Sequence, residues 1–324
     1  MTLQQLRYFL AVAETRHFTR AAERVYVAQP SLSKQIHALE EELGSPLFSR
    51  TRGNVSLTPA GEALLPIATR IVADVDTAAV AVGELTGLRK GRVRVGATPS
   101  LCATVLAEVL RRFHTRYPGV ELVVEENGSR DLVGLVGSGE LDLALVTVPT
   151  KGDQPALTTV PILRESLMVA APEGSPIARN ETIRLRDLRD QPLVMFRRGY
   201  DLRETTLHAC REAGFEPRLA VQGGEMDAVL RFVEAGLGVA IVPSMVLSGR
   251  PALTGTRLTE PDITRTIALV HRTDAAPTHA ALRFRATLLE FVAESAAHGG
   301  LPPGVRPTTE TREQTGQDQR RETD

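Results

Sequence analysis

Residues 18–52 read FTRAAERVYVAQPSLSKQIHALEEELGSPLFSRTR, and this stretch predicts two short helices joined by a turn. Thr19 fits the N-cap of the first helix, because its hydroxyl can accept a hydrogen bond from a free backbone amide. Residues 26–29 form the predicted turn. Pro30 opens the second helix at a position where its missing N–H costs little. Gly44 ends that helix, since glycine tolerates the left-handed conformation of a C-terminal cap.

The second predicted helix has one apolar face and several polar ones. Its apolar residues recur at spacings of three and four, which directs one stripe inward; they are Leu32, Ile36, Leu39 and Leu43. The polar residues on its other faces are Gln29, Ser31, Ser33, Lys34 and His37. Hydroxyls and amides beside a cation, gathered at a helix N-terminus, are typical of residues that read base edges in helix-turn-helix proteins. The alternative is an ordinary helical hairpin with a polar outer surface.

Two short extended pieces follow, residues 47–50 and 54–57, around a turn at 51–54. This pattern predicts a wing. Arg50 at its base and Arg52 at its tip are placed to reach a phosphate or the neighbouring minor groove. Alone, two surface arginines would indicate only solvated charge, but beside a helix-turn-helix they favour DNA contact. The predicted DNA-binding residues are Thr19, Gln29, Pro30, Ser31, Ser33, Lys34, His37, Arg50 and Arg52.

Length, composition and charge limit the classes of protein to which this chain can belong. A length of 324 residues favours at least two domains. No apolar run approaches the ~20 residues needed to cross a bilayer, and the first residues lack a basic signal-peptide region, so we expect a cytoplasmic protein without membrane contact. The net charge is −1. Residues 1–58 nevertheless carry seven Arg and Lys against five Asp and Glu, a local charge of +2 that suits DNA.

Catalytic and metal-binding motifs are missing from the sequence. It contains no GxSxG, GxxxxGK[ST] or HExxH motif, and its seven histidines are scattered. Cys102 and Cys210 lie far apart and neither belongs to a CxxC pair, which argues against a zinc site or a disulfide scaffold. We therefore expect no metal, no cofactor and no enzymatic activity.

A long helix is predicted to follow the wing. Thr58-Pro59 is a helix-start signal, and the helix should reach about residue 88, before the sequence Arg89-Lys90-Gly91 ends it. Some thirty residues would span roughly 45 Å. A narrow apolar stripe of coiled-coil spacing runs along it, formed by Leu64, Ile67, Ile71, Val75, Ala78, Val82 and Leu85. The stripe pairs either with a second chain or with this chain's own core.

From Gly91 onward, apolar strands alternate with helical stretches, which predicts α/β units with parallel sheets. Two such series suggest two lobes joined by crossing segments near 147–163 and 257–267. We predict an effector half at 91–298, with lobe I at about 91–161 and 266–298 and lobe II at about 162–265. The tail, 299–324, has few apolar residues, so we expect it to be disordered and dispensable.

Polar residues follow several predicted strands where each strand ends. Thr98 and Ser100 follow the strand 93–97, Asn127 and Ser129 follow the next, and Thr147 ends the third. Carboxyl ends of parallel strands share one edge, where open α/β sheets bind ligands. The free amides of the helix after Thr98 favour an anion. The alternative for either hydroxyl is a simple N-cap.

The second lobe offers a cation at its own strand end. Phe196 ends the strand 192–196 and Arg197 follows it, where the guanidinium could form two hydrogen bonds with a carboxylate. The alternative is a plain surface arginine. Together the two lobes predict a site for a small organic anion.

The order of these motifs resembles the LysR-type transcriptional regulators over roughly residues 1–295. The residues that carry the resemblance are 6–50, LTPAG at 57–61, GRVRVGATPS at 91–100, GELDLALV at 139–146 and VEAGLGVAIVPS at 233–244. The resemblance implies a winged helix-turn-helix, a long linker helix and a bilobed α/β effector domain like that of periplasmic solute-binding proteins. It implies binding to double-stranded promoter DNA as a homodimer, or as a homotetramer.

The resemblance also implies an effector cleft between the lobes, bordered by residues 223–226 and by Val242. The full predicted effector set is Thr98, Ser100, Leu101, Asn127, Ser129, Thr147, Phe196, Arg197 and Val242. One branch of the family senses oxidants through paired cysteines, but we expect buried or idle thiols here. Two other classes stay open. A solute-binding protein would not need residues 1–58, and a DNA-binding protein without ligand response would not need the cleft.

Overall fold

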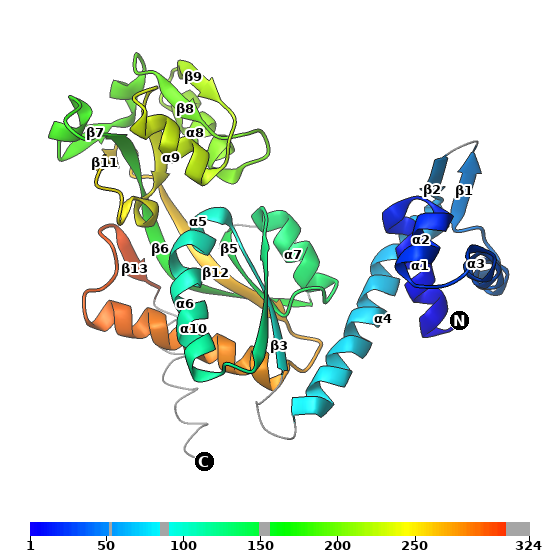
Figure 1. The fold of residues 1–324 in the computed structure, drawn as a ribbon. Coiled ribbons are helices and arrows are strands. Elements are labelled where there is room, and N and C mark those ends of the chain that lie inside the picture. Colours follow the sequence, from blue (N-terminus) through cyan, green and yellow to red (C-terminus); the bar gives the residue numbers. More distant parts are fainter. Residues whose placement is uncertain (52–53, 85–90, 149–155, 309–324) are drawn as a thin grey trace.

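The computed structural model describes residues 1–51, 54–84, 91–148 and 156–308. Figure 1 shows three parts: a small N-terminal module, a long helix α4, and two α/β lobes. The N-terminal module stands apart from the lobes, and α4 leads from it to the nearer lobe (Figure 1). No helix among the described residues is long and apolar enough to span a membrane.

The N-terminal module is a winged helix-turn-helix. Its elements are α1 (Leu3–Thr15), α2 (Phe18–Arg24), α3 (Gln29–Leu43), β1 (Phe48–Thr51) and β2 (Asn54–Leu57). The predicted inward stripe of α3 is confirmed at Leu32, Ile36 and Leu39, which are fully buried in one core with Phe9. Leu43 is 43% exposed and lies outside this core. The left-handed stop at the end of α3 is confirmed, since the C-cap Gly44 has φ 69°.

The expected cap of α2 is wrong. The N-cap is His17, whose Nδ1 accepts hydrogen bonds from the backbone amides of Thr19 at 3.2 Å and Arg20 at 3.5 Å. Thr19 is already inside the first turn. A histidine ring nitrogen in an extended residue can play the acceptor role that sequence rules assign to a hydroxyl.

Helix α4 (Pro59–Glu84) begins after Thr58, whose Oγ1 accepts from the Gly61 amide at 3.1 Å. Its apolar stripe divides between two environments. Leu64 and Ile71 pack against the core of the N-terminal module. The exposed members of the stripe are Ile67 at 56%, Val75 at 41% and Val82 at 69%. Leu85 and the expected end of the helix lie outside the described residues.

Lobe I contains a parallel three-stranded core extended by antiparallel strands. Its consecutive elements are β3 (Gly91–Ala97), α5 (Pro99–Leu101), the π-helical turn η1 (Cys102–Leu106), α6 (Ala107–Arg116), β4 (Val120–Glu126), α7 (Ser129–Gly137) and β5 (Leu143–Val148). The strand order is β4-β3-β5, followed by β12 (Thr264–Arg272) and β6 (Leu157–Pro172). Helix α10 (His279–Ala297) packs Phe284 edge-on against Phe113, with ring centroids 5.2 Å apart.

Lobe II has its own hydrophobic core. Its elements are η2 (Ile177–Arg179), β7 (Thr182–Arg184), η3 (Leu185–Leu188), β8 (Leu193–Met195), α8 (Asp201–Glu212), β9 (Leu219–Gln222), α9 (Met226–Glu234), β10 (Ala240–Pro243), η4 (Ser244–Leu247) and β11 (Leu253–Thr259). Strands β10 and β11 pair with the second half of β6, and β7 extends this sheet beside β11.

The passage from lobe I to lobe II occurs inside the single strand β6. Its pairing with β12 ends at Ser166, and its pairing with β10 begins at Leu167. The passage therefore lies just beyond the predicted segment 147–163, because one continuous strand belongs to both sheets. The return falls between β11 and β12, within the predicted segment 257–267.

The expected disorder of the tail is wrong as far as residue 308. Strand β13 (Val305–Pro307) pairs antiparallel with β6 and places Val305 opposite Glu165. The Ser166 amide donates to the Gly304 carbonyl at 2.9 Å, and Thr308 Oγ1 donates to the Pro161 carbonyl at 2.6 Å. Tail composition did not predict this strand, because a backbone ladder on a free sheet edge needs few apolar side chains. Residues 309–324 lie outside the described residues.

Candidate functional site

The N-terminal end of α3 presents the predicted polar residues to solvent. Gln29, Pro30, Ser31 and Lys34 are exposed, and Ser33 is partly buried. The Gln29 amide donates to Ser33 Oγ at 3.1 Å, which fixes the direction of both side chains. The surface therefore offers amide, hydroxyl and ammonium groups at the end of the helix that enters the major groove in this class of module.

The wing is fastened to α3 through Glu40. Its Oε1 accepts from the backbone amides of Leu47 at 2.8 Å and Phe48 at 3.3 Å, immediately before and at the start of β1. On the outer side, Arg50 Nη1 lies 3.1 Å from His37 Nε2. Since a guanidinium only donates, Nε2 accepts, and His37 Nδ1 can then donate toward Glu40 Oε2 at 3.3 Å.

Arg50 also lies over the Phe18 ring, 4.6 Å from its centroid. This residue is thus held against the module, with its guanidinium still partly exposed. Arg52 lies outside the described residues. Thr19 is exposed on α2, and its backbone amide is used by His17.

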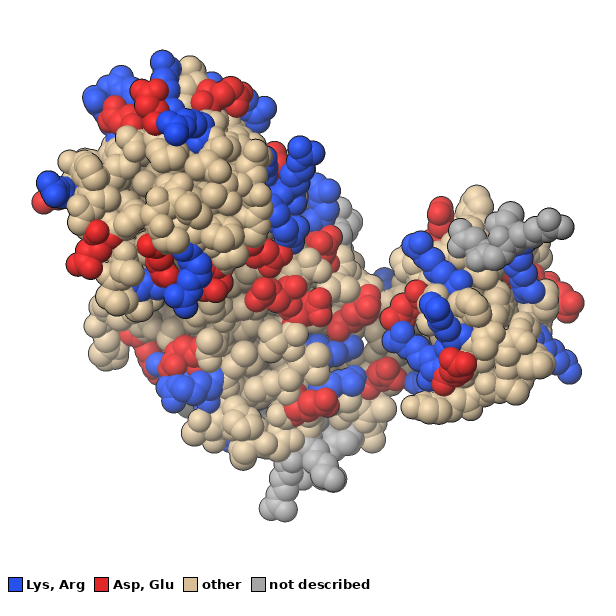
Figure 2. All heavy atoms as spheres, turned by 45° about the horizontal axis from the view of Figure 1, so that its top comes forward, with Lys and Arg blue, Asp and Glu red and all other residues tan. Residues whose placement is uncertain are grey.

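Sequence reasoning missed Tyr26, which lies between α2 and α3. Its side chain is 95% exposed and its backbone φ is 55°. A large aromatic ring held in solvent at the turn of a helix-turn-helix is a candidate DNA-backbone contact. Figure 2 shows Lys and Arg side chains interspersed with acidic ones over the N-terminal module, rather than one continuous basic patch.

The structure brings the predicted polar residues of lobe I to one edge. Ala97 ends β3 and pairs with Glu126, which ends β4, and with Leu145 of β5, which runs on to Val148; the carboxyl ends of the three parallel strands therefore lie at one edge. The Thr147 amide donates to Ser129 Oγ at 3.1 Å, and Asn127 Oδ1 accepts from the Gly128 amide at 2.9 Å. The predicted convergence of these residues is therefore present.

Thr98 and Ser100 have different surroundings. Thr98 precedes α5 without a side-chain cap bond, and its buried Oγ1 has no hydrogen-bond partner among the described residues. Ser100 is 1% exposed, and its Oγ accepts from Arg265 Nη1 at 2.9 Å. A simple capping role is thus excluded for the Thr98 hydroxyl in this structure.

A buried ion pair that the sequence did not reveal lies at the junction of the lobes. Arg265 Nε donates to Glu165 Oε2 at 2.8 Å; Arg265 Nη2 lies equally close to that oxygen but without hydrogen-bond geometry. Glu165 is fully buried, and its Oε1 accepts from the Met245 amide at 2.7 Å. The pair joins β6, the strand that passes between the lobes, to β12 of lobe I, and it contacts Ser100.

Lobe II departs in part from the prediction. Arg197 is exposed, but its Nε already donates to Glu225 Oε1 at 2.7 Å. The Phe196 side chain is buried and stacks on Tyr200, with centroids 4.7 Å apart. Leu101, Phe196 and Val242 belong to the two lobe cores, because their side chains are at most 1% exposed. These three residues are buried as a whole, so the structure does not place them on the surface of a cleft.

Tyr200 is a second residue that sequence reasoning missed. Burial raises the pKa of its hydroxyl, and the charges of Arg265 and Glu126 from across the junction also act on that pKa. Tyr200 is thus close enough to the charged groups of lobe I for them to act on it. Only its position shortly after the strand 192–196 could have indicated this.

The two cysteines are free. Burial raises the pKa of Cys102 to about 12 and that of Cys210 to about 11. Cys102 donates to the Ala97 carbonyl at 3.4 Å, and Cys210 is buried in α8. Both thiols stay protonated at neutral pH and are poor nucleophiles. No group of three His, Cys, Asp or Glu that could hold a metal occurs among the described residues.

Comparison with known proteins finds a matching family model for the N-terminal module and another for the two lobes. Residues 3–62 match the model for the bacterial regulatory helix-turn-helix protein, lysR family, and residues 86–293 match the LysR substrate binding domain. The transcriptional dual regulator GltC of Bacillus subtilis is 34% identical, covering 75% of this chain and 81% of GltC. A probable hydrogen peroxide-inducible genes activator of Streptomyces viridosporus is 36% identical, covering 85% of this chain and 89% of that protein.

Solved structures of full-length proteins resemble this chain over nearly its whole length. A full-length OxyR variant from Pseudomonas aeruginosa superposes with a TM-score of 0.70 at 26% identity, covering 96% of this chain and 98% of that one. Full-length CbnR in complex with its target DNA superposes with a TM-score of 0.66 at 27% identity, covering 91% of this chain and 100% of that one. The relatives are transcriptional regulators and not enzymes. The chain belongs to the LysR family of DNA-binding, effector-responsive transcriptional regulators.

Proposed function

We propose that the protein acts in the cytoplasm as a dimer on promoter DNA, and that a small organic anion bound between its lobes changes its hold on that DNA. Residues 1–58 would form the DNA-binding domain, 59–90 the dimerisation linker and 91–298 the effector domain. The observation that carries the effector site is the buried Thr98 hydroxyl, which has no hydrogen-bond partner among the described residues and lies two positions before Ser100, the residue that Arg265 contacts. Buried hydroxyls are almost always hydrogen-bonded, so one without a protein partner marks a place for a ligand.

An anion suits this place for two reasons. The helical segment at 99–116 begins there, and because Pro99 has no N–H and the Leu101 and Cys102 amides donate to the Thr98 carbonyl, the Ser100 amide is the one left to face an anion. The Arg265 guanidinium lies beside it, bound to Ser100. Lobe II can close over the anion with the Tyr200 hydroxyl, and with Arg197 once it exchanges Glu225 for the ligand. Contacts from both lobes give the ligand a different affinity for the closed and open arrangements, which is what a regulatory shift requires.

The effector proposal is tested by Thr98→Val, which removes the hydroxyl and nearly keeps the shape. The length of the DNase footprint is measured with and without each member of a panel of small carboxylates and their neutral amides. We expect one carboxylate to change the footprint of the unaltered protein and to lose this effect in Thr98→Val, while basal operator binding persists. Thr115→Val, at an exposed position on α6, is the matched control. An effector that acts equally on Thr98→Val disproves the cleft assignment.

The DNA-binding proposal is tested by Ser33→Ala and Lys34→Ala. Loss of a base contact should weaken operator binding by about 1–3 kcal/mol. Arg50→Ala should weaken binding to all sequences alike and lower the salt dependence, if Arg50 holds a phosphate. Arg24→Ala is the control, because Arg24 is an exposed cation on α2 that pairs with Glu14 at 2.8 Å. A folded Ser33/Lys34 double variant with normal operator affinity contradicts the assignment.

The dimer proposal rests on the exposed part of the α4 stripe. Ile67, Val75 and Val82 are large apolar residues in solvent on one helix, which is costly unless a second chain covers them. Charges introduced there would have to be desolvated in a dimer, so Ile67→Glu with Val75→Glu should give monomers in analytical ultracentrifugation. Leu237→Glu, at an exposed apolar position in lobe II, should leave the dimer intact. Dimers that survive in the double variant would place the interface elsewhere.

Peroxide sensing, suggested by the name of the Streptomyces relative, is not favoured for this chain. Such sensing needs an accessible thiolate. Burial holds the pKa of Cys102 and Cys210 at about 12 and about 11, so neither supplies one.

A further inference from the structure

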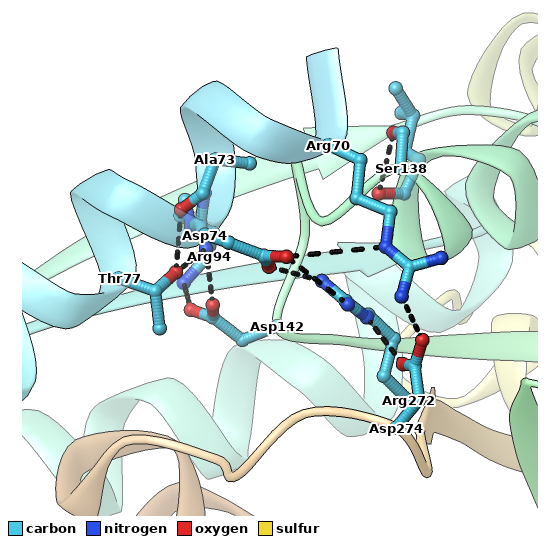
Figure 3. Close-up of polar contacts among 10 residues, drawn as sticks. Arg70, Ala73, Asp74, Thr77, Arg94, Ser138, Asp142, Arg272 and Asp274 are labelled. Atoms are coloured by element: carbon cyan, nitrogen blue, oxygen red, sulfur yellow. Dashed lines mark hydrogen bonds and ion pairs between the residues drawn. The ribbon is translucent and has the colours of Figure 1, made fainter. Parts of the chain in front are cut away.

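Helix α4 is joined to lobe I by a compact set of ion pairs, drawn in Figure 3. Arg272, at the end of β12, donates through Nη1 to Asp74 on α4 at 2.6 Å and through Nε to Asp274 at 2.9 Å. Arg70 of α4 also contacts Asp274. The Arg272 side chain is only 10% exposed, so these contacts are shielded from solvent at their centre.

Two further features bring α4 close to the lobe. Arg94 of β3 donates to Asp142 at 2.6 Å and to Thr77 of α4 at 3.3 Å (Figure 3). Gly139 has φ +77°, and a Cβ there would lie 2.9 Å from Arg272 Nη1 and 3.2 Å from Ala73 Cβ. The glycine thus permits an approach that any other residue would obstruct.

A cavity of about 340 Å³ is lined in part by the residues that make these contacts. Asp74 and Thr77 of α4 form one wall, and the rest belongs to lobe I. The apolar part of the lining includes Leu141, Leu143, Leu269, Pro277 and Ala281. The lining combines these apolar side chains with polar and charged ones, among them Asp142, Thr278 and Arg285, and a cavity of this volume suits a small molecule.

One polar atom of a lining residue, His271, lacks a partner within the part of the chain that the structure describes. His271 Nδ1 lies 3.0 Å from the Arg272 carbonyl, which can only accept, so Nδ1 carries the proton and Nε2 is a bare acceptor. Nε2 is buried and has no hydrogen-bond partner among the described residues. Burial lowers the pKa of His271, so the ring stays neutral at neutral pH and Nε2 keeps its lone pair.

We propose that this cavity binds a small, uncharged, largely apolar molecule whose single N–H or O–H donor bonds to His271 Nε2. A neutral ligand is favoured because none of the three cations in the lining is free: Arg94 and Arg272 have carboxylate partners, and Arg285 has an interaction of its own. The site is separate from the interlobe cleft. His271 is six residues from Arg265 along β12, which is roughly 20 Å at the rise of a strand.

The position of the cavity gives its ligand a regulatory effect. The ligand touches both α4, which carries the DNA-binding module, and lobe I, so it changes the angle or the stiffness of their joint. This effect rests on the proposed function, whereas the binding itself does not.

The test uses indole and 1-methylindole as probes of the full-length protein. Indole has an apolar body and one N–H donor, and methylation removes the donor. The chain contains no Trp, so the fluorescence anisotropy of the probe is measured without background from that residue. We expect indole to bind about tenfold more tightly than 1-methylindole, because an unmet buried acceptor is costly.

Three variants locate the probe. His271→Phe keeps the ring and removes the acceptor, so indole should bind about tenfold more weakly while 1-methylindole is unaffected, which also shows that the cavity survives. Ala281→Leu should abolish the binding of both probes by filling the cavity. His114→Phe, at an exposed position outside the lining, should change neither.

Several results would overturn the inference. They are no binding of indole, equal binding of indole and 1-methylindole to the unaltered protein, and unchanged indole binding in His271→Phe. Loss of indole binding in Thr98→Val would assign the probe to the interlobe cleft, which overturns this site but leaves the proposed function standing. An indole-dependent change in the DNA footprint that His271→Phe removes would support the regulatory part.

Discussion

Replacing Glu165 by Gln should loosen the connection between the two lobes. Glu165 is fully buried and Arg265 is 8% exposed, and the two residues join β6, which passes between the lobes, to β12 of lobe I. Gln has the same shape as Glu and can still accept from the Met245 amide, which Glu165 Oε1 does now at 2.7 Å. It no longer offsets the charge of Arg265. A buried guanidinium is then left without a counter-ion.

The expected cost follows from this arrangement. Removing one partner of a buried ion pair costs about 3–5 kcal/mol. Because Gln keeps one of the acceptor roles, we expect the lower end, about 3 kcal/mol, or roughly 100-fold in the equilibrium for local opening. Adding Arg265→Met removes the unbalanced charge, so the double variant should be more stable than Glu165→Gln alone.

Hydrogen exchange followed by mass spectrometry measures this local opening in peptides of β6 and β12. The control is Glu290→Gln, because Glu290 is 42% exposed and lies 3.6 Å from Arg116; an exposed pair should contribute at most about 1 kcal/mol. The reasoning is refuted if exchange in Glu165→Gln stays within about threefold of the unaltered protein. It is also refuted if the double variant is as destabilised as the sum of the single ones.

Three further predictions concern other parts of the chain. A chain ending at residue 300 lacks β13, so we expect faster amide hydrogen exchange in the middle of β6 and a melting temperature lower by a few degrees. Hydrogen exchange identical to that of the full chain would mean that β13 contributes nothing to stability. Gly61→Ala would place a Cβ 2.2 Å from the Leu47 carbonyl oxygen, so it should destabilise the N-terminal module by about 1–3 kcal/mol and weaken operator binding. Its control is Gly134→Ala, whose Cβ would have no atom within 4 Å and should not destabilise the protein. Burial raises the pKa of Cys210 to about 11, so its thiolate is scarce below that pH. Mass spectrometry should therefore find that iodoacetamide alkylates Cys210 slowly at about pH 7–9 until urea unfolds the chain. Rapid alkylation of the folded protein would contradict this prediction.

The sequence by itself determined the parts that depend on neighbours along the chain. The apolar spacing of Leu32, Ile36 and Leu39 predicted the buried face of α3, and Gly44 predicted its end. The alternation of apolar runs and helical stretches predicted two α/β lobes. The strand ends predicted that Asn127, Ser129 and Thr147 would share an edge, because the register of parallel strands follows from their order.

Sequence rules failed at the start of α2, where a histidine plays the capping role that a hydroxyl side chain usually has. His17 caps α2 in place of the expected Thr19, since a ring nitrogen can accept as a hydroxyl does. Phe196 was expected in the cleft but is buried, because the last residue of a strand points to one face or the other and sequence alone did not fix which.

Only the tertiary structure decided which distant residues meet. Glu165 and Arg265 are a hundred positions apart, and Asp74 and Arg272 are 198 apart, so no spacing rule connects them. Their pairing depends on the antiparallel register of β6 and β12 and on a helix packing against a lobe. The burial that makes Thr98 Oγ1 and His271 Nε2 notable is likewise a product of packing. Sequence patterns record what each segment prefers, whereas unpaired groups and cavities arise only when several segments meet.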